Sequence, residues 1–560
     1  LMIRRPPSST LSSSSAASDV YKSQLLMIAL SILQPAWQFV RPGGVGGAIS
    51  SGGVALVFLP KDNKNTFNIT IDMPEFTPVE TTDRVTREVG AVLRNNQYVL
   101  NYQSWVGQTG IIDFNGLLKG ASNKKGAFVA EVRVNLTDKK IRDVSSIDLV
   151  AQLRPVMESI QQRYPGSVIQ LVEDLPGPPL RSTVLAEIYG KDPNKLREIS
   201  EKVSTVFKDT YGVVEVHDSE MADVPQFRVV VDKEKAALSG VSVAQVAQAL
   251  RRMVNGDEMG RLHISAEKKI VPIRLHIPYK HQVDPLLLSS IYLTNKDGKR
   301  VPLSELTQVV QDTQDRPILH KDYERVTYVG AELSDSAPVY AVMDIDQRLD
   351  NMPLGEGETL TTGNLRLQSI TPDTIDGYQL LWDGEIRLTL DVFRDMLGAL
   401  GIALVFIYLL LVGYYASFRI SLIAMSAIPL GLIGVFPGHW IMGEPFTSTS
   451  MIGVIALAGV VVRNSLLIID FVMDYVKQGM SAHEAVREAG AVRLRPILLT
   501  ALAIVLGSAV MLSDPVFGGL AISLIFGTIV STALTLVVIP MLLYSMLRRQ
   551  ALNSSTIGEK

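Results

Sequence analysis

The residues most able to carry chemistry lie in an apolar stretch near the C-terminus. Arg463 stands in the run IALAGVVVRNSLLII, with apolar residues on both sides. A charge at the centre of a membrane span costs at least about 2.5–3.5 kcal/mol on insertion scales, so Arg463 should face a partner inside a helix bundle. Asp470 follows two helical turns later and could pair with it through water, while Asn464 could hydrogen-bond to a neighbouring helix. The set could serve as a proton relay or only as a packing ion pair.

Other reactive signatures are missing from the sequence. There is no cysteine, which excludes disulfides, thiol catalysis and metal sites with Cys ligands. His483-Glu484 is not a zinc motif, because the second His four residues after the first is missing. No GxSxG or P-loop occurs in a fitting context, so neither a membrane enzyme nor ATP-driven transport is supported. The net charge of −3 gives no sign of a nucleic-acid partner.

Five long apolar runs surround these residues. They cover 394–414, 420–442, 447–474, 495–513 and 517–546. Each approaches or exceeds the ~20 residues that cross a ~30 Å hydrocarbon core. Five in succession with short connections favour a membrane bundle over the buried core helices of a soluble protein.

The charges in the connections predict an orientation. Lys and Arg gather at 415–420, at 475–494 and at the start of the tail 547–560, whereas 443–446 and 513–516 carry none. The positive-inside rule places the basic connections and the tail in the cytoplasm. Ser481 and Glu484 form a capping box, which predicts a short amphipathic helix over 481–492 at the cytoplasmic interface.

The N-terminal part is of another kind. Residues 1–24 are Ser-rich without an apolar period, and we expect a disordered or foreign leader. Residues 25–59 are apolar but contain Pro35, Arg41 and a Gly-rich segment, which predicts one interrupted span. If this span crosses the membrane, residues 61–393 lie outside the cytoplasm.

Residues 61–393 show strand and helix patterns that repeat. In 61–175, strands are predicted at 67–74, 127–136 and 168–173, with helices opened by capping boxes at Thr77 and Ser145. A second set begins at 179–217, with a strand at 183–190 and a helix opened by Asp192-Pro193.

The second set resumes much later in the chain. Residues 311–390 predict strands at 325–333 and near 378–383, with a helix near 337–350 between them. The intervening 218–310 reads as an inserted domain, with a strand at 227–231 and two short helices split by Gly240. The predicted fold is therefore an α-helical membrane bundle with α+β sandwiches of ferredoxin-like type, built from βαβ repeats.

This organisation resembles the C-terminal half of resistance-nodulation-division (RND) efflux permeases over residues 25–547. The resemblance is carried by LPKDNKNTFNITIDMP (59–74), VPQFRVVVDKEKAALSGVSVAQVAQAL (224–250), IPLGLIGV (428–435), GVVVRNSLLIIDF (459–471) and VRLRPILLTALAIVLG (492–507). It implies that 61–175 is one periplasmic pore subdomain, that 179–217 and 311–390 form the second, and that 218–310 is a docking insert. It also makes 25–59 the seventh span of the family and 394–546 the last five.

The resemblance further implies a bacterial inner-membrane homotrimer with a large periplasmic domain. Such a pump works with a periplasmic adaptor (membrane fusion) protein and an outer-membrane channel. The proton motive force drives it, with no cofactor and no resident metal. This chain would need the missing N-terminal half of the permease, whose first-half aspartates are the main partners of the buried cation.

The resemblance also assigns roles to single residues. Arg463 stands where the multidrug branch usually has Lys, and because a guanidinium does not deprotonate in proteins it can act only as a fixed counter-charge. Carboxylates paired with it would change pKa when the geometry changes, which couples proton uptake to conformation. Thr500 matches a relay threonine and Arg493 an arginine near the cytoplasmic mouth. A back-bond to the helix and a positive-inside anchor are the respective alternatives.

The substrate is less well indicated. Tyr102, Trp105 and Phe114 fall near the aromatic drug-pocket segment of the family, with core packing as the alternative. The predicted function is proton antiport that exports drugs and amphiphiles. A heavy-metal efflux pump stays an alternative, although the methionines are scattered. A non-transporting membrane sensor and a protein-export auxiliary are further alternatives, but a purely structural subunit has little reason to retain Arg463, Asn464 and Thr500 together.

Overall fold

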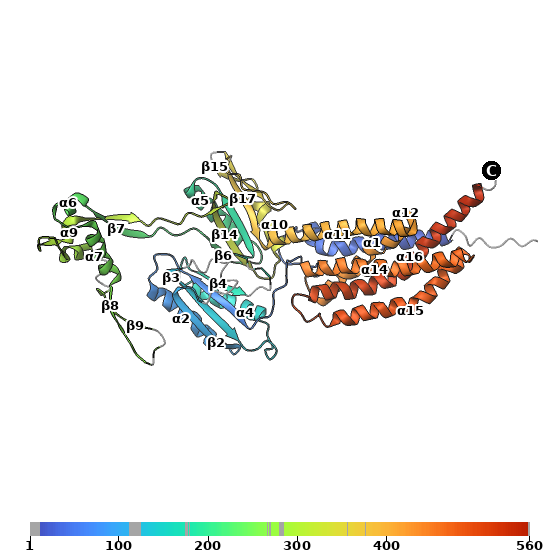
Figure 1. The fold of residues 1–560 in the computed structure, drawn as a ribbon, viewed down its shortest axis with the longest axis horizontal. Coiled ribbons are helices and arrows are strands. Elements are labelled where there is room, and N and C mark those ends of the chain that lie inside the picture. Colours follow the sequence, from blue (N-terminus) through green and yellow to red (C-terminus); the bar gives the residue numbers. More distant parts are fainter. Residues whose placement is uncertain are drawn as a thin grey trace, which may run out of the picture. The chain divides into compact units, whose positions relative to one another are not determined.

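The computed structural model of the 560-residue chain resolves into two compact units (Figure 1). It describes residues 12–110, 125–173, 177–178, 180–265, 267, 270–278, 285–355, 357–375 and 377–557. The first unit comprises Leu1–Glu220 and Ile318–Lys560, and the second is Met221–Pro317. The second unit covers most of the insert predicted at 218–310.

The first α/β body, here the first sandwich, follows the order strand, helix, two strands, helix, strand. Its elements are β1 (Thr66–Asp72), α2 (Val79–Arg94), β2 (Val99–Gln108), β3 (Lys125–Leu136), α4 (Ser146–Gln161) and β4 (Val168–Glu173). The sheet order is β2-β3-β1-β4 and every neighbouring pair is antiparallel. Phe67, Ile69 and Ile71 alternate along β1 into a core shared with both helices, so the intervening residues point to the other face.

The helix starts of this sandwich test the capping predictions. The Ser145 hydroxyl accepts a hydrogen bond from the Asp148 backbone N–H, as the sequence predicts. The capping box at Thr77 is wrong, because Pro78 with ψ 152° occupies the N-cap position itself and no side chain caps α2. Thr77 therefore lies one residue outside the helix, too early to meet its amides.

The second sandwich is assembled from both sides of the insert. Its elements are β5 (Val184–Tyr189), α5 (Pro193–Lys208), β6 (Val213–Asp218), β13 (His320–Lys321), β14 (Glu324–Leu333), α10 (Pro338–Leu349), β15 (Met352–Gly355), β16 (Glu358–Gly363) and β17 (Tyr378–Gly384). The sheet order is β13-β14-β5-β17-β16-β15, and β6 also pairs with β14. Phe207, Ile345 and Trp382 lie in its core, where Phe207 and Trp382 stack. Strands β15 and β16 are absent from the sequence prediction.

The second unit begins and ends on one two-stranded ribbon. Its elements are β7 (Pro225–Val231), α6 (Lys233–Leu238), α7 (Val243–Asn255), β8 (Asp257–Leu262), β9 (Val271–Leu275), η2 (Pro285–Ser290), β10 (Tyr292–Thr294), β11 (Arg300–Pro302), α9 (Leu303–Leu306) and β12 (Thr307–Thr313). β7 pairs antiparallel with β12. Gly240, at φ +70°, separates α6 from α7 as predicted, because a left-handed residue ends a helix at little cost only when it is Gly.

The remaining helices are apolar, and most of them are long. They are α1 (Ser12–Val40), α11 (Glu385–Tyr415), α12 (Phe418–Met425), α13 (Ile428–Met442), α14 (Ser448–Lys477), α15 (Ala482–Ala509) and α16 (Gly518–Ile557). Among the described residues, six segments could cross a membrane by length and composition: Ser23–Val40, Glu385–Tyr415, Phe418–Met442, Ser448–Lys477, Ala482–Ala509 and Gly518–Arg549. α13 packs closely on α16, since a Cβ on Gly434 would lie 2.3 Å from the Phe526 carbonyl oxygen.

Several helix boundaries differ from the sequence prediction. The amphipathic helix at 481–492 and the span at 495–513 are one continuous helix, α15, because the residues between them are good helix formers. Residues 12–24, assigned to a disordered leader, belong to α1. That helix ends at Val40, and the Arg41 side chain then binds the carbonyls of the Gly-rich segment. α11 begins at Glu385, directly after β17, and not near 394.

Candidate functional site

Arg463 lies on α14 with its side chain exposed. Its neighbours Val462 and Asn464 are buried against the other helices, so Arg463 occupies the opposite face. No hydrogen bond or ion pair of Arg463 is found among the described residues. A guanidinium on an apolar helix needs a partner, and no described residue of this chain provides one.

Asp470 is half-buried and takes another partner. The Tyr415 hydroxyl donates a 2.7 Å hydrogen bond to Asp470 Oδ1, which ties α11 to α14. Asp470 makes no direct contact with Arg463, because two helical turns separate them by about 10 Å along the axis, and their pairing through water stays a prediction. Tyr415 is a residue that sequence reasoning missed, and its only signal is its place at the end of an apolar run.

Asn464 and Thr500 make no hydrogen bond to a neighbouring helix among the described residues. Asn464 is 2% exposed, and its Oδ1 has no hydrogen-bond partner in the described part of the chain. The Thr500 hydroxyl donates to the Ile497 carbonyl at 2.9 Å, which is the back-bond to its own helix. Neither residue contacts Arg463 by a hydrogen bond, and the relay roles of both stay predictions.

Arg493 on α15 is half-buried and lies over an aromatic ring of a neighbouring helix. Its guanidinium carbon is 3.6 Å from the centre of the Phe471 ring, a cation–π contact between α15 and α14. Its Nε is buried and has no partner within the described residues. Phe471 adjoins Asp470, so Tyr415, Asp470, Phe471 and Arg493 form one connected row across three helices.

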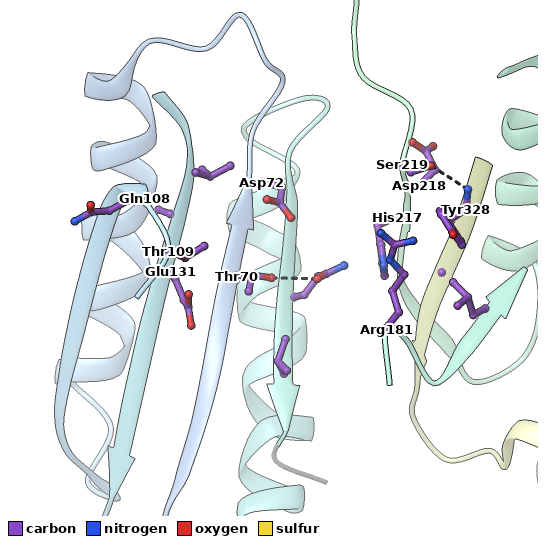
Figure 2. A pocket seen from close by; sticks show the side chains of 16 residues that line it. Thr70, Asp72, Gln108, Thr109, Glu131, Arg181, His217, Asp218, Ser219 and Tyr328 are labelled. Carbon is purple, nitrogen blue, oxygen red and sulfur yellow. Dashed lines mark hydrogen bonds between the residues drawn. The ribbon is translucent and has the colours of Figure 1, made fainter. Parts of the chain in front are cut away.

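A cleft of about 190 Å³ separates the two sandwiches outside the bundle (Figure 2). Thr70, Asp72 and Glu131 line it from the face of the first sheet that carries no helix. Arg181, His217, Asp218, Ser219 and Tyr328 line it from the second sandwich. Arg181 lies 3.9 Å over the Tyr328 ring, and burial raises the pKa of Asp218. The cleft thus combines three carboxylates and one paired guanidinium with apolar side chains such as Val172 and Leu185.

Tyr102 and Trp105, two of the three predicted aromatic residues, do not belong to the described lining of this cleft. Tyr102 packs on α2, where a Cβ on Gly90 would lie 2.7 Å from its hydroxyl oxygen, and Arg94 donates to that oxygen at 3.2 Å. Trp105 covers Gly110 in the same way. Tyr102 packs against the apolar core of the first sandwich, and the substrate-binding role of both residues stays a prediction. Phe114 lies outside the described residues.

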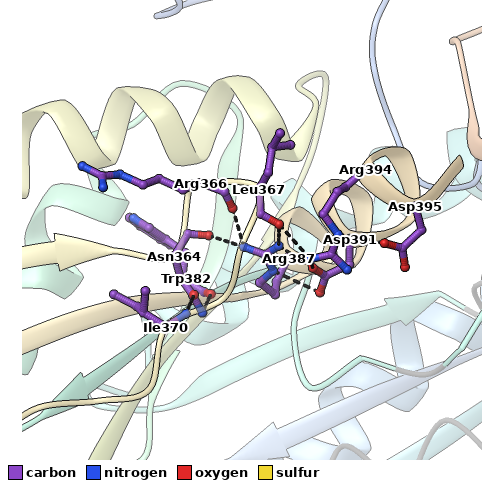
Figure 3. Close-up of polar contacts among 9 residues, drawn as sticks. All are labelled: Asn364, Arg366, Leu367, Ile370, Trp382, Arg387, Asp391, Arg394 and Asp395. Atoms are coloured by element: carbon purple, nitrogen blue, oxygen red, sulfur yellow. Dashed lines mark hydrogen bonds and ion pairs between the residues drawn. The ribbon is translucent and has the colours of Figure 1, made fainter. Parts of the chain in front are cut away.

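A buried guanidinium joins the second sandwich to α11 (Figure 3). Arg387, in the first turn of the helix, donates to the carbonyls of Asn364, Arg366 and Leu367 at 2.8, 2.8 and 3.3 Å. It also forms a two-point ion pair with Asp391. Its five N–H donors are therefore all used, and the segment after β16 is held against a candidate membrane span.

Comparison with known proteins gives a consistent family. The AcrB/AcrD/AcrF family matches residues 45–548. The chain is 28% identical over 371 residues to the cobalt-zinc-cadmium resistance protein CzcA of Cupriavidus metallidurans. The aligned region covers 65% of this chain and 33% of that protein. It is 23% identical over 417 residues to the multidrug resistance protein MdtC of Serratia proteamaculans, covering 73% of this chain and 38% of that protein.

The fold is shared with a solved structure. A crystal structure of a heavy metal efflux pump superimposes with a TM-score of 0.70 at 19% identity, over 96% of this chain and 50% of that one. The chain thus spans about a third of the length of the curated relatives and about half of the solved pump. Because the family match covers most of its residues, the chain belongs to the AcrB/AcrD/AcrF family of RND permeases.

Proposed function

We propose that this chain is the C-terminal half of a proton-driven RND efflux permease, a secondary transporter and not an enzyme. The observation that carries the proposal is Arg463, which is exposed on a candidate membrane span and has no partner among the described residues. Leaving it unpaired in a membrane would be costly. Carboxylates from the first half of the permease would meet this requirement, and their protonation would be coupled to their distance from a fixed cation.

The row Tyr415, Asp470, Phe471 and Arg493 supports a relay that extends beyond Arg463. It connects α11, α14 and α15 through one hydrogen bond and one cation–π contact. Movement of one of these helices would therefore shift the other two. α11 continues directly from β17 and is clamped by Arg387, so the same helix would pass movement to the second sandwich.

We assign the two sandwiches as ferredoxin-like pore subdomains and the second unit as the docking insert. The order and antiparallel pairing of β2-β3-β1-β4 support the first assignment. In this proposal the complete permease is a homotrimer in the bacterial inner membrane, with these domains in the periplasm. It would work with a periplasmic adaptor protein and an outer-membrane channel.

Two substrate classes have support, one from the residues that line the cleft and one from the likeness to CzcA. Small amphiphilic drugs fit a cleft that combines carboxylates with the Arg181–Tyr328 stack. A metal cation is favoured by the likeness to CzcA. Against it, His217 uses both ring nitrogens on Ser182 and on the Glu215 carbonyl, and no group of three or more His, Asp or Glu poised for a metal occurs among the described residues.

Export assays separate the two classes. Cells that carry the complete permease are loaded with ethidium or with Zn²⁺, and efflux is followed with and without a protonophore. Protonophore-sensitive ethidium export supports the drug pump, and the same result for Zn²⁺ supports the cation pump. If neither probe leaves the cell faster than in cells with Arg463→Ala, the proposed function is wrong for both classes.

A further inference from the structure

The two sandwiches meet through polar contacts and not through a shared core. Each has its own buried apolar cluster, one around Ile69 and Leu149 and the other around Val203 and Trp382. The cleft opens between them, lined by the helix-free face of the first sheet. Two bodies with separate cores can change their separation without unpacking either core, so the contacts that join them decide how far the cleft opens.

Glu215 has an unusual backbone at this junction. Its φ is +56°, a left-handed conformation that a Glu seldom adopts. The register between β6 and β14 shifts at this point, because Gly330 pairs with His217 whereas Glu332 pairs with Val214. Two residues of β6 thus face one of β14, which is a β-bulge that redirects a side chain out of the normal alternation.

The redirected side chain crosses to the first sandwich. Glu215 Oε1 accepts a hydrogen bond from Arg154 Nε on α4 at 2.8 Å, and Oε2 accepts one from the Leu171 backbone N–H at 3.1 Å. Both side chains of the ion pair are buried, at 13% and 7% exposure. Leu171 lies on β4, the edge strand of the first sheet, so Glu215 occupies the position that another strand would take.

This contact adjoins the lining of the cleft. Gln170 and Val172, on either side of Leu171, are lining residues of the cleft. His217 and Asp218, just after Glu215, line it from the opposite side. The contact of Glu215 with Leu171 therefore joins two chain segments that line opposite walls of the cleft.

We propose that Glu215 is a positioning residue, the pivot that sets the spacing of the two sandwiches and so the opening of the cleft. The effect of this pivot on transport rests on the proposed function. The position of the pivot rests only on the contacts of Glu215. In this bulged, left-handed conformation the Glu215 side chain contacts Arg154 and Leu171, and these contacts offset the local backbone strain. Opening and closing of the cleft then turns about this contact and leaves both cores intact.

The charges around the pivot make it responsive to protonation. Burial raises the pKa of Glu215 to about 7, with Arg154 acting against the rise and Glu332 adding to it. The other titratable neighbours on its own strand are His217, whose Nδ1 contacts the Glu215 carbonyl, and Asp218. Protonation of the Glu215 carboxylate would keep the hydrogen bond from the Leu171 N–H and would weaken the attraction to Arg154.

The geometric test uses the complete permease with two spin labels. Cysteines replace Ser104 on the first sandwich and Asp322 on the second, both exposed, and this chain has no cysteine of its own. Glu215→Gln keeps the size and one acceptor but removes the charge that holds Arg154. We expect a longer mean distance between the labels and a broader distribution. An unchanged distribution in Glu215→Gln would overturn the proposal.

The matched control is Glu88→Gln. Glu88 pairs with Arg163, and both belong to the first sandwich, so this change removes an ion pair that does not join the two bodies. We expect the label distances to stay as in the wild type. If the control moves them as much as Glu215→Gln does, the effect is general destabilisation and the pivot is refuted.

The transport arm uses ethidium or Zn²⁺, whichever the wild-type permease exports. A pivot acts on the cycle and not on substrate contacts, so Glu215→Gln should lower kcat at least about fivefold with KM changed less than about twofold. A variant that alters KM alone would contradict the role. If the wild type exports neither probe, the proposed function fails, while the label distances still decide the pivot.

Discussion

Replacement of Arg387 by Met should release the segment that follows β16. The guanidinium has 8% side-chain exposure and donates to three backbone carbonyls and to Asp391. Methionine fills much the same volume but leaves those carbonyls and a carboxylate without their donor. Removal of one side of a buried pair costs about 3–5 kcal/mol. Since about 1.36 kcal/mol is tenfold, the segment should open about 150- to 5,000-fold more often.

Trypsin cleavage after Arg366 measures this opening. Arg366 lies in the released segment, and cleavage requires several residues around it to leave their contacts. When opening is fast relative to cleavage, the cleavage rate follows the equilibrium population of the open form. The cleavage rate in the detergent-solubilised permease should therefore rise by the same factor, about 150- to 5,000-fold.

Arg394→Met supplies the comparison within the same network. Arg394 also pairs with Asp391 and contacts the Leu367 carbonyl, but 35% of its side chain is exposed. Exposed pairs contribute about 0–1 kcal/mol, so cleavage should rise at most about fivefold. Equal cleavage rates in the two variants would refute the reasoning that burial makes Arg387 the clamp.

Three further predictions follow from the other sites. Arg463→Ala should abolish efflux by the assembled permease and Arg463→Lys should retain part of it, because only a cation is required; wild-type efflux by the alanine variant would show a structural role. A cysteine at Met480 should react with an impermeant maleimide only in opened cells, and labelling of intact cells would reverse the predicted topology. The pKa of Glu215, about 7 against an ordinary 4.5, means that the folded state binds more protons in this window. The raised pKa of Glu215 thus contributes stability that is fully present below pH 4.5 and is lost as the pH rises to about 7. Glu215→Gln should flatten the pH dependence of thermal unfolding there, and an unaltered slope would count against the shifted carboxyl.

The sequence determined the parts of this protein that depend on local composition. Apolar runs and the basic connections predict the membrane helices and their orientation, since insertion depends on the residues of each segment alone. Ser145 and Asp192 mark helix starts correctly because a cap is a contact over three residues or fewer. The insert could be recognised because strand and helix patterns resume on its far side.

The tertiary structure decided which side chains meet. Asp470 bonds to Tyr415 and not to Arg463, and Arg493 lies over Phe471, because the rotation and separation of packed helices choose among several residues within reach. The Thr500 hydroxyl donates to the Ile497 carbonyl of its own helix. The left-handed bulge at Glu215 has no local signal, since Glu has no preference for that conformation. It exists because contacts with Arg154 and Leu171, distant in the sequence, stabilise a backbone that the local residues disfavour.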